Sequence, residues 1–557
     1  MAPPLRALVP RWRALVPQRW RALVRREVRF PGAFVADRRV SRWRDLLWGG
    51  ASEAAIPALQ AFCDGAGGRW ANPLWAQLQA SLTLAAWWDF QGDTDRALQL
   101  LMGLANGPLR VAQNPARIIP LAVLLQRTGQ TGAARDLIAQ ALRITPTLLW
   151  NPDFTLIRAN LAADDASRLT LINQIYTGRG FAPLAFLPLL VPDRPAAVAP
   201  DMPPDITPDQ PKVSVILPAF QAQECIAAAL ASLSAQTHAN LEIIVVDDAS
   251  TDDTAHIVDR LARSDPRIRV LRLVQNGGAY GARNHGLAQA TGQFITTHDA
   301  DDWSHPQKIA TQIRALAHNQ ALMAVMTHWV RCRPGLQFTP GWRLSHRLID
   351  WSHSSLLVRR AVFDRLGGWD EVRVSADTEL IWRIEAAYGA GTVAKIHPDL
   401  PLAFARDIPG SLTRNPQTHA RSIYAGLRHY YREISRYWQA RYPQGLPPAA
   451  QAQRRAMLPA AMFGPDRGPV PDILLSGDLA DPAVIARARQ YLAQHPDPRC
   501  GISHRPDCAR FRPTPTHAAR FCDGFFALLQ EGRLQIVLPE DAARIATRIT
   551  LTAGGRQ

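Results

Sequence analysis

The sequence predicts an α/β protein with a mixed, mainly parallel sheet and helices on both faces, preceded by an all-helical domain. From residue 212 onward, apolar runs at 212–218, 241–248, 268–273 and 293–297 alternate with amphipathic stretches. Buried strands separated by helices are typical of parallel sheets. Residues 50–185 show only helical periodicity, and eight prolines between Pro188 and Pro211 predict a stiff, extended linker.

Length and composition limit the kind of protein. With 557 residues, two to four domains are expected. The net charge of +16 favours an anionic partner, but no nucleic-acid-binding module is recognisable, so we expect none. Six scattered cysteines predict reduced thiols and a cytoplasmic protein, and the Cys500–His504–Cys508–His517–Cys522 spacing fits no usual zinc pattern.

The N-terminal segment, residues 1–47, is rich in arginine and tryptophan and repeats the unit Arg-Ala-Leu-Val. Such a segment could lie in a headgroup layer, with its arginines on anionic lipid, or it could be a disordered basic tail or an extension from a misassigned start codon. Neither a secretory signal nor an apolar run of about 18 residues is visible. We therefore expect a soluble protein or one peripheral on the inner face of the cytoplasmic membrane.

Residues 48–187 are predicted to form a helical, tetratricopeptide-like domain. The stretches "GDTDRALQLL" from Gly92 and "GQTGAARDLI" from Gly129 place glycine, alanine and leucine at equivalent positions 37 residues apart. This offset is close to the repeat length of about 34 residues of such proteins, which present a concave surface to protein partners. An ordinary helical bundle is the alternative.

Carboxylates cluster where the predicted strands end. Asp247 and Asp248 follow the second strand, and Asp299, Asp301 and Asp302 follow the fourth. In open α/β sheets, ligands bind at the carboxyl ends of strands. Bare acids in one cleft repel and raise one another's pKa, whereas Mg²⁺ or Mn²⁺ with a diphosphate removes the conflict. The cluster predicts a metal-borne diphosphate ligand; helix capping is the alternative for Asp252 and Asp253.

Four blocks together resemble the family-2 glycosyltransferases: "VSVILPAF", "VVDDASTDDT", "NGGAYGARNHGLAQATGQFITTHDADD" and "SADTEL". The resemblance covers about residues 212–415. It implies a GT-A fold over residues 212–440 and transfer, with inversion, from a nucleotide-diphosphate sugar, most often a UDP-sugar. The acceptor would be a glycan or a lipid-linked hydroxyl in cell-surface polysaccharide synthesis.

The resemblance also implies roles for individual residues. Pro218 and Glu224 would border the nucleotide, Asp247 would bind the base, and Asp299 would hold the ribose or sugar edge. Arg283 would lie near the diphosphate or brace the acids. Asp301 would be the principal metal ligand, with Asp302 as a second. Asp377 would be the general base that takes the proton of the acceptor hydroxyl.

Several positions depart from the family pattern or leave alternatives open. Ala219-Phe220 stands where Tyr-Asn is common, Ala376 precedes the base in place of Glu, and His298 replaces an apolar residue. Trp369 could stack on a sugar or fill the core. Arg406 and Arg414 could close over the phosphates or lie in solvent.

Residues 441–557 predict strand–loop–helix units at 472–492 and again from Arg533, together a small α/β unit. The sequence can be compared with two other functions. A sugar-nucleotide pyrophosphorylase would need a glycine-rich, arginine-containing loop after the first strand, which "PAFQAQECI" lacks. A non-catalytic, nucleotide-binding scaffold that recruits partners through its helical repeats remains the alternative.

Overall fold

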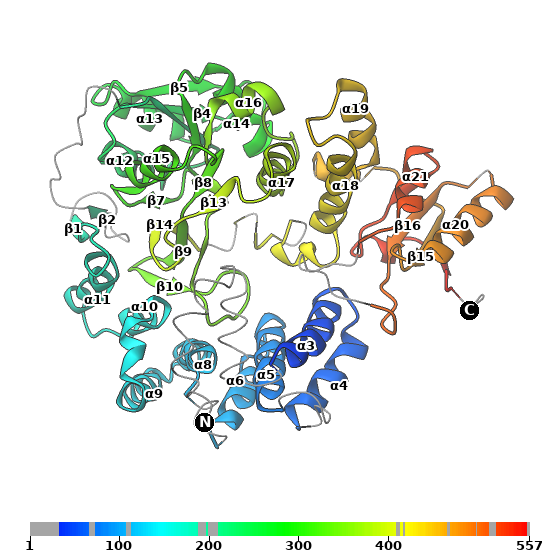
Figure 1. The fold of residues 1–557 in the computed structure, drawn as a ribbon, viewed down its shortest axis with the longest axis horizontal. Helices are drawn as coiled ribbons and strands as arrows, with labels where there is room; N and C mark the ends of the chain where they lie inside the picture. The colour runs from blue at the N-terminus through cyan, green and yellow to red at the C-terminus, as the bar shows by residue number, and fades with distance from the viewer. Residues whose placement is uncertain are drawn as a thin grey trace, which may run out of the picture.

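The computed structural model describes residues 33–65, 73–106, 113–187, 196–198, 210–407, 411, 413–415, 418–464, 468–496, 498–511 and 520–553. Figure 1 shows an arc of N-terminal helices (blue to cyan) along one side of an α/β domain (green), with a small C-terminal unit (orange to red) beyond helices α18 and α19. The Arg-Ala-Leu-Val repeats and most of the proline-rich linker lie outside the described residues.

The main sheet confirms the fold class predicted for the α/β domain. It has seven strands in the order β13-β8-β12-β6-β3-β4-β5. All neighbouring pairs are parallel except those of β12, which is antiparallel to both neighbours. The strands are β3 (Val213–Ala219), β4 (Leu241–Asp247), β5 (Ile268–Arg272), β6 (Phe294–Thr297), β8 (Ala324–Met326), β12 (Leu357–Arg359) and β13 (Val393–Lys395).

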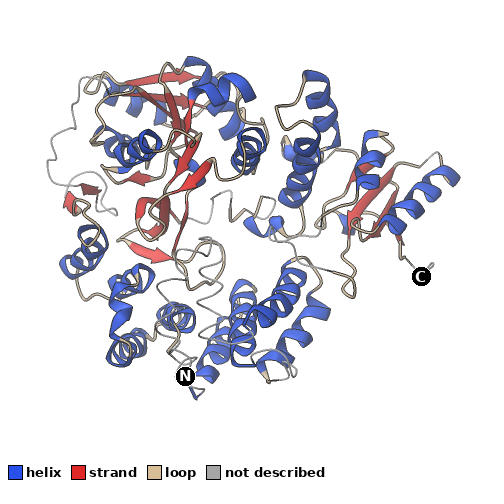
Figure 2. Ribbon diagram, viewed as in Figure 1, coloured by secondary structure: helices blue, strands red, loops and turns tan. Residues whose placement is uncertain are grey.

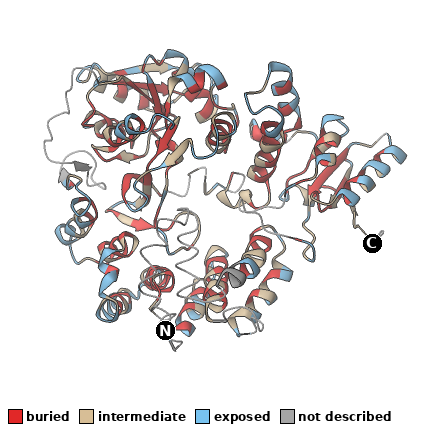
Figure 3. Cartoon of the chain, viewed as in Figure 1, coloured by how far each residue is buried: buried red, intermediate tan, exposed pale blue. Residues whose placement is uncertain are grey.

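Alternating side chains of the central strands enter two separate cores. Val213, Val215 and Leu217 of β3 pack with α12 (Ile226–Ser234), α13 (Thr254–Ala262) and α15 (Lys308–His318). Ile216 points to the other face, toward α14 (Gly278–Gln289), α16 (Arg360–Leu366) and α17 (Ala376–Tyr388). Because successive strand residues point to opposite faces, apolar side chains at nearly every position require helices on both sides. Figure 3 shows the central strands buried beneath these helices.

A second sheet extends the domain toward the helical arc. Its order is β10-β9-β14-β7, with β11 also paired to β9. The strands are β7 (Trp303–Ser304), β9 (His328–Arg333), β10 (Gln337–Thr339), β11 (Ile349–Trp351) and β14 (Pro401–Arg406). Strand β7 begins directly after Asp302, so this sheet fixes the end of the loop that carries Asp299, Asp301 and Asp302.

The N-terminal domain consists of helices (Figure 2). They are α3 (Ala33–Trp48), α4 (Ser52–Cys63), α5 (Pro73–Phe90), α6 (Thr94–Gly103), α8 (Pro115–Arg127), α9 (Thr131–Ile144), α10 (Pro152–Asn160) and α11 (Asp165–Thr177), with a short β1–β2 pair (Ala185–Leu187, Ala196–Val198) beyond them. Gly92 and Gly129, both at positive φ, precede α6 and α9 as the repeat predicts. The tetratricopeptide-like assignment itself stays a prediction.

The helical domain is docked on the second sheet through a shared core and buried hydrogen bonds. Leu121 and Phe154 belong to the same apolar cluster as Val330 and Phe338. Asn160 and Phe338 exchange two bonds: the amide Nδ2 donates to the Phe338 carbonyl and the Phe338 N–H donates to Oδ1, each at 2.7 Å. The side of the arc that faces the α/β domain is therefore filled by the chain itself.

The C-terminal unit begins after two further helices, α18 (Leu427–Arg441) and α19 (Pro448–Met457). Its four parallel strands lie in the order β17-β16-β15-β18, with α20 (Pro482–Gln494) and α21 (Asp523–Gln530). The strands are β15 (Ile473–Gly477), β16 (Cys500–His504), β17 (Leu534–Ile536) and β18 (Thr547–Thr550).

The second strand–loop–helix unit predicted from Arg533 is wrong. After β17 the chain forms only one 3₁₀ turn at Ala542–Arg544 and then enters β18. The physical reason is that Ile549 lies opposite Leu475 of β15, so this segment completes the sheet instead of covering it. Three β-branched residues in "TRIT" also favour a strand.

Candidate active site

The predicted site residues of the first two strands lie at the carboxyl ends of neighbouring parallel strands. Ala219, next to Pro218, is paired with Asp247 at the ends of β3 and β4. The N–H of His298 donates to the Ile216 carbonyl at 3.0 Å, so the loop bearing Asp299 starts beside β3. The parallel register thus brings three separate motifs to one edge of the sheet.

The two acids after β4 have different local partners. Asp248 accepts bonds from the N–H groups of Gly277 and Gly278 at 2.8 and 2.9 Å, at the start of α14. Asp247 is also buried, and its side chain accepts a long bond, 3.3 Å, from the N–H of Ser250. Asp248 thus stabilises the start of α14, whereas Asp247 retains acceptor capacity for a ligand.

Arg283 joins two of the predicted acids. Its Nη1 donates to Oδ1 of Asp377 at 3.1 Å, and its Nη2 donates to Oδ1 of Asp299 at 2.9 Å. The arginine side chain is 6% exposed, against 35% for Asp299 and 21% for Asp377. One guanidinium, held on the buried face of α14, therefore connects the loop after β6 with the first turn of α17.

Asp377 is kept ionised although it is partly buried. Burial raises its pKa, but Arg283, His353, a hydrogen bond with Tyr280 and Arg428 together outweigh that effect and lower the pKa below its ordinary value. Its place in the first turn of α17 acts in the same direction, because a helix N-terminus favours negative charge. A carboxylate that must accept a proton has to be ionised first, and this environment provides that.

The acids of the "DADD" segment are not equivalent. Asp301 is partly exposed, whereas Asp302 is 5% exposed. Burial, Asp301 and Asp299 raise the pKa of Asp302, and Lys308 and Arg331 only partly oppose them. Lys308 is itself buried and donates to the Ser304 hydroxyl at 3.0 Å. The mutual repulsion predicted from the sequence is thus present in the fold.

A divalent cation fits this donor set in a limited way. Among the residues that the structure describes, no group of three or more His, Cys, Asp and Glu side chains is arranged to hold a metal ion. Mg²⁺ and Mn²⁺ often take only one or two carboxylates and complete their shell with phosphate oxygens and water. The partly exposed Asp301 suits that arrangement, and the buried Asp302 suits it less well.

Two other predicted residues meet at the side of the site. Arg406, at the end of β14, places Nη2 3.4 Å from Oε2 of Glu224, which is 75% exposed. Arg414 instead forms a two-pronged contact with Asp407, whose side chain is 1% exposed. Of the two arginines, Arg406 is therefore the one placed beside a predicted pocket residue, while Arg414 fixes a loop.

Trp369 and His298 have structural surroundings. Trp369 is 6% exposed and packs on Phe363 with ring centroids 4.9 Å apart, while its backbone exchanges two bonds with Asn284. His298 is buried, and burial together with Lys308 lowers its pKa to about 3. The tryptophan belongs to the core, and the histidine is a buried, neutral residue next to the acids.

Sequence reasoning missed three residues that face Asp377. Tyr280 precedes Arg283 by three positions, so helical spacing places both on one side of α14 and could have indicated it. His353 lies in a short 3₁₀ turn, with Nε2 3.4 Å from the Thr378 hydroxyl. Arg428 comes from α18, and no sequence motif indicated its role.

Comparison with known sequences agrees with this arrangement. The family model described as Glycosyl transferase family 2 matches residues 214–367. This part of the chain belongs to glycosyltransferase family 2. The mixed, mainly parallel main sheet has the GT-A layout expected for such a domain.

The family-2 domain has curated relatives with names that include an acceptor. It is 41% identical over 107 residues (19% of this chain, 42% of the relative) to the UDP-Glc:alpha-D-GlcNAc-diphosphoundecaprenol beta-1,3-glucosyltransferase WfgD of Escherichia coli. It is 46% identical over 94 residues (16% and 30%) to the GalNAc(5)-diNAcBac-PP-undecaprenol beta-1,3-glucosyltransferase of Campylobacter jejuni. EpsE of Bacillus subtilis is 29% identical over 171 residues (29% and 62%), so less than two thirds of each of these relatives is spanned.

Solved structures resemble the chain more distantly. S. aureus TarS 1-349 in complex with UDP-GlcNAc shares 20% identity with a TM-score of 0.33, covering 44% of this chain and 70% of that one. The mannosyltransferase PcManGT from Pyrobaculum calidifontis, in complex with GDP-Man and Mn2+, shares 22% with a TM-score of 0.31, covering 47% and 75%.

Proposed function

We propose that the protein transfers a sugar, with inversion, from a nucleotide-diphosphate sugar to the hydroxyl of a glycan or lipid-linked acceptor. The observation that carries this is the Asp299–Arg283–Asp377 contact at the carboxyl edge of the sheet in a family-2 domain. It sets an ionised carboxylate at one end of a guanidinium and the acidic loop at the other. The nucleotide would lie along the ends of β3 and β4, against Pro218 and Asp247, with a UDP-sugar the first donor to test.

The chemistry assigns each end of this contact a task. Asp377 accepts the proton of the acceptor hydroxyl while the acceptor oxygen bonds to the anomeric carbon. The bond from that carbon to the diphosphate oxygen breaks, and the leaving nucleoside diphosphate keeps the electron pair. A single displacement of this kind inverts the anomeric centre. Arg283 keeps Asp377 ionised before the reaction and offers positive charge beside the acidic loop.

A divalent metal, Mn²⁺ or Mg²⁺, belongs to this proposal. Asp301 would hold it, with Asp302 as the second candidate, and the ion would offset the charge of the diphosphate. Glu224, in the loop after β3, and Arg406, at the end of β14, would border the nucleotide.

An acceptor at a membrane is supported by the diphosphoundecaprenol named for two of the relatives. No helix in the described part of the chain is both long and apolar enough to cross a bilayer. From the acceptors named for these relatives, we propose that the protein acts on the inner face of the cytoplasmic membrane as a peripheral protein. Co-flotation with anionic vesicles, absent with neutral vesicles, checks this placement.

Release of free nucleotide tests the proposed reaction. The wild type is incubated with a panel of UDP- and GDP-sugars, with Mn²⁺, with Mg²⁺ or with chelator, and the configuration of any product is read by NMR. Asp377→Asn should lower turnover by about 10²- to 10⁴-fold because the proton acceptor is lost. Asp364→Asn, an exposed acid on α16, is the matched control and should retain activity. Nucleotide binding without turnover across the panel would favour the scaffold alternative.

A further inference from the structure

Helix α18, like the turn that carries Asp377, lies beyond the family match over residues 214–367, and one of its side chains reaches that turn. Nη1 of Arg428, in the first turn of α18, donates to the Ser375 hydroxyl at 3.1 Å, and its Nε donates to the Thr418 carbonyl at 3.1 Å. Ser375 is two residues before Asp377. Arg428 therefore connects α18, the loop before it and the start of α17.

The Ser375 turn has a conformation that calls for support. Its φ is 70°, in the left-handed region, which is uncommon for residues other than glycine. Its carbonyl accepts the N–H of Glu379 at 3.1 Å, so α17 starts from this turn. Because Asp377 lies in the same turn of helix, a change at Ser375 moves the carboxylate.

Arg428 also acts on Asp377 through its charge. The groups that face Asp377 are Arg283 and Tyr280 from α14, His353 from the 3₁₀ turn and Arg428 from α18. Arg283 shares its charge between Asp377 and Asp299. Within the part of the chain that the structure describes, no carboxylate pairs with Arg428 at salt-bridge distance, and the carboxylate whose charge acts on it is that of Asp377.

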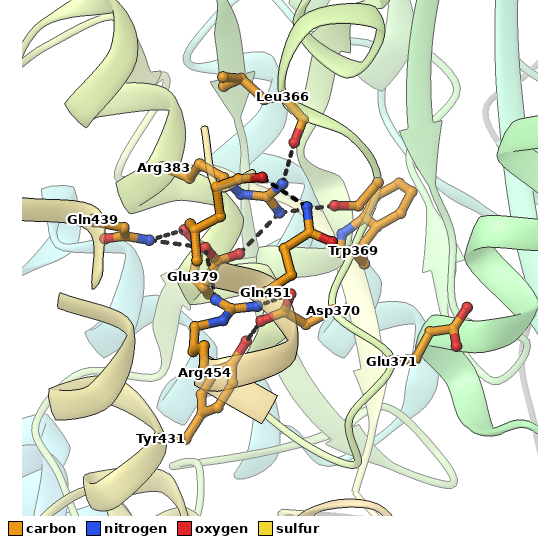
Figure 4. A network of polar contacts seen from close by, with 12 residues as sticks. Leu366, Trp369, Asp370, Glu371, Glu379, Arg383, Tyr431, Gln439, Gln451 and Arg454 are labelled. Atoms are coloured by element: carbon orange, nitrogen blue, oxygen red, sulfur yellow. Dashed lines mark hydrogen bonds and ion pairs between the residues drawn. The ribbon is translucent and has the colours of Figure 1, made fainter. Parts of the chain in front are cut away.

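A buried network keeps α18 and α19 fixed against α17 (Figure 4). Gln439 of α18 donates to both the carbonyl and Oε1 of Glu379, at 3.1 and 2.9 Å. Arg454 of α19 pairs with Asp370 and lies 3.6 Å from Oε1 of Glu379. Glu379 is 1% exposed, and its other oxygen accepts from Arg383 at 2.9 Å. Helix α18 is thus held at Glu379, two residues after Asp377, which leaves Arg428 little freedom to move.

We propose that Arg428 is a positioning residue for Asp377, which makes α18 part of the catalytic machinery although it lies beyond the family-2 match. The proposal rests on the proposed function. Arg428 holds the Ser375 turn in its left-handed conformation and supplies a positive charge that is not shared with the donor-side acids. Without it, Asp377 is both less well placed and more easily protonated.

The experiment compares Arg428→Gln and Arg428→Lys with the wild type in nucleotide release from pH 4.5 to 9. Arg428→Gln should lower kcat about 10- to 100-fold, as expected for a misplaced reacting group, with the donor KM changed by less than about threefold. The acid limb of kcat/KM should move to higher pH, since a cation that favours the ionised carboxylate is gone. Arg428→Lys should restore the acid limb but only part of kcat.

Control measurements keep this test separate from the test of the function. Arg441→Gln, at the exposed end of the same helix, should behave as the wild type. Calorimetric binding of UDP with Mn²⁺ should be unchanged in Arg428→Gln. An unshifted acid limb, or a raised donor KM at constant kcat, would overturn the role of Arg428. A wild type without turnover would instead overturn the proposed function. In that case Arg428 is tested by stability instead of turnover. The urea midpoint of unfolding decreases as the pH is lowered, and in Arg428→Gln this decrease should begin at a higher pH than in the wild type.

Discussion

Replacing Arg283 by methionine is the perturbation with the most readable consequence. Methionine retains much of the length of the side chain but removes the charge between Asp299 and Asp377. Removing one partner of a buried ion pair costs about 3–5 kcal/mol, because a charge stays buried without compensation. Both acids keep some solvent contact, at 35% and 21% exposure, so the lower end, about 3 kcal/mol at pH 7.5, is expected.

The loss should depend on pH with a defined sign. The pKa of Asp377 lies below its ordinary value in the folded wild type, because Arg283 and its other partners outweigh burial. Such a group contributes stability that is full above its unfolded pKa and is lost as the pH falls through the folded pKa. Without Arg283, burial raises the pKa of the carboxyl, and it becomes protonated at mild acidity. The stability difference between wild type and variant should therefore shrink from pH 7.5 toward pH 4.5.

Urea unfolding followed by tryptophan fluorescence at the two pH values measures this difference. Arg499→Met is the control, because Arg499 and its partner Asp472 are 62% and 51% exposed, and an exposed pair contributes at most about 1 kcal/mol. Asp377→Asn in the Arg283→Met background should recover part of the lost stability. A variant within about 1 kcal/mol of the wild type, or a loss equal at both pH values, would refute the role given to Arg283.

Three further predictions concern the frame of the site. Gly286→Ala on α14 should destabilise the protein by about 1–3 kcal/mol in urea, since its Cβ would meet the Ile216 side chain at 2.5 Å. Gly281→Ala on the same helix is the control, because its Cβ would meet nothing within 4 Å. Equal losses of stability in the two variants would contradict this prediction. Glu242 has a pKa of about 2, because hydrogen bonds from Ser214 and Thr291 outweigh burial. Glu242→Gln should therefore lower the free energy of unfolding by about 3 kcal/mol at pH 7, and this loss should diminish as the pH falls from about 4.5 toward 2. A loss that does not depend on pH would contradict this prediction. Asn160→Ala leaves the Phe338 N–H and carbonyl unpaired and should cost about 2–4 kcal/mol, with faster amide exchange in β10; unchanged exchange would show that these bonds do not hold the helical domain in place.

The strands were predictable because their burial is uniform. The runs at 213–219 and 241–247 are apolar along nearly their whole length, a pattern that only a sheet covered on both faces explains. The helix starts after Gly92 and Gly129 were predictable because positive φ favours glycine. The segment around Thr547–Thr550 was mispredicted as a helix because its helical pattern is short and its pairing with β15 is distant in sequence.

The candidate site was only partly predictable. Motifs placed Asp299, Arg283 and Asp377 in one site, but their direct connection depends on the fold, since Arg283 and Asp377 are 94 positions apart. Arg428 carries no signal, because a lone arginine at the start of a basic helix resembles any solvated residue. Residues 212–440 were predicted as one domain, and that boundary stays a prediction. Arg454 nevertheless reaches back across it to Asp370 and Glu379.

The docked helical domain bears on the choice between an enzyme and a scaffold. A recruiting array of helical hairpins would offer its concave side to a partner, but here that side is packed on the second sheet through Asn160 and the shared apolar core. A protein partner would have to bind a surface that stays exposed, and the candidate is Trp150, which is 83% exposed next to Leu149 at 46%. If recruitment were the main function, Trp150→Ala should abolish the polysaccharide synthesis that the protein supports in the cell, and Asp377→Asn should not. The transferase proposal requires the opposite pattern, because it depends on the ionised carboxylate of Asp377 and not on the exposed Trp150.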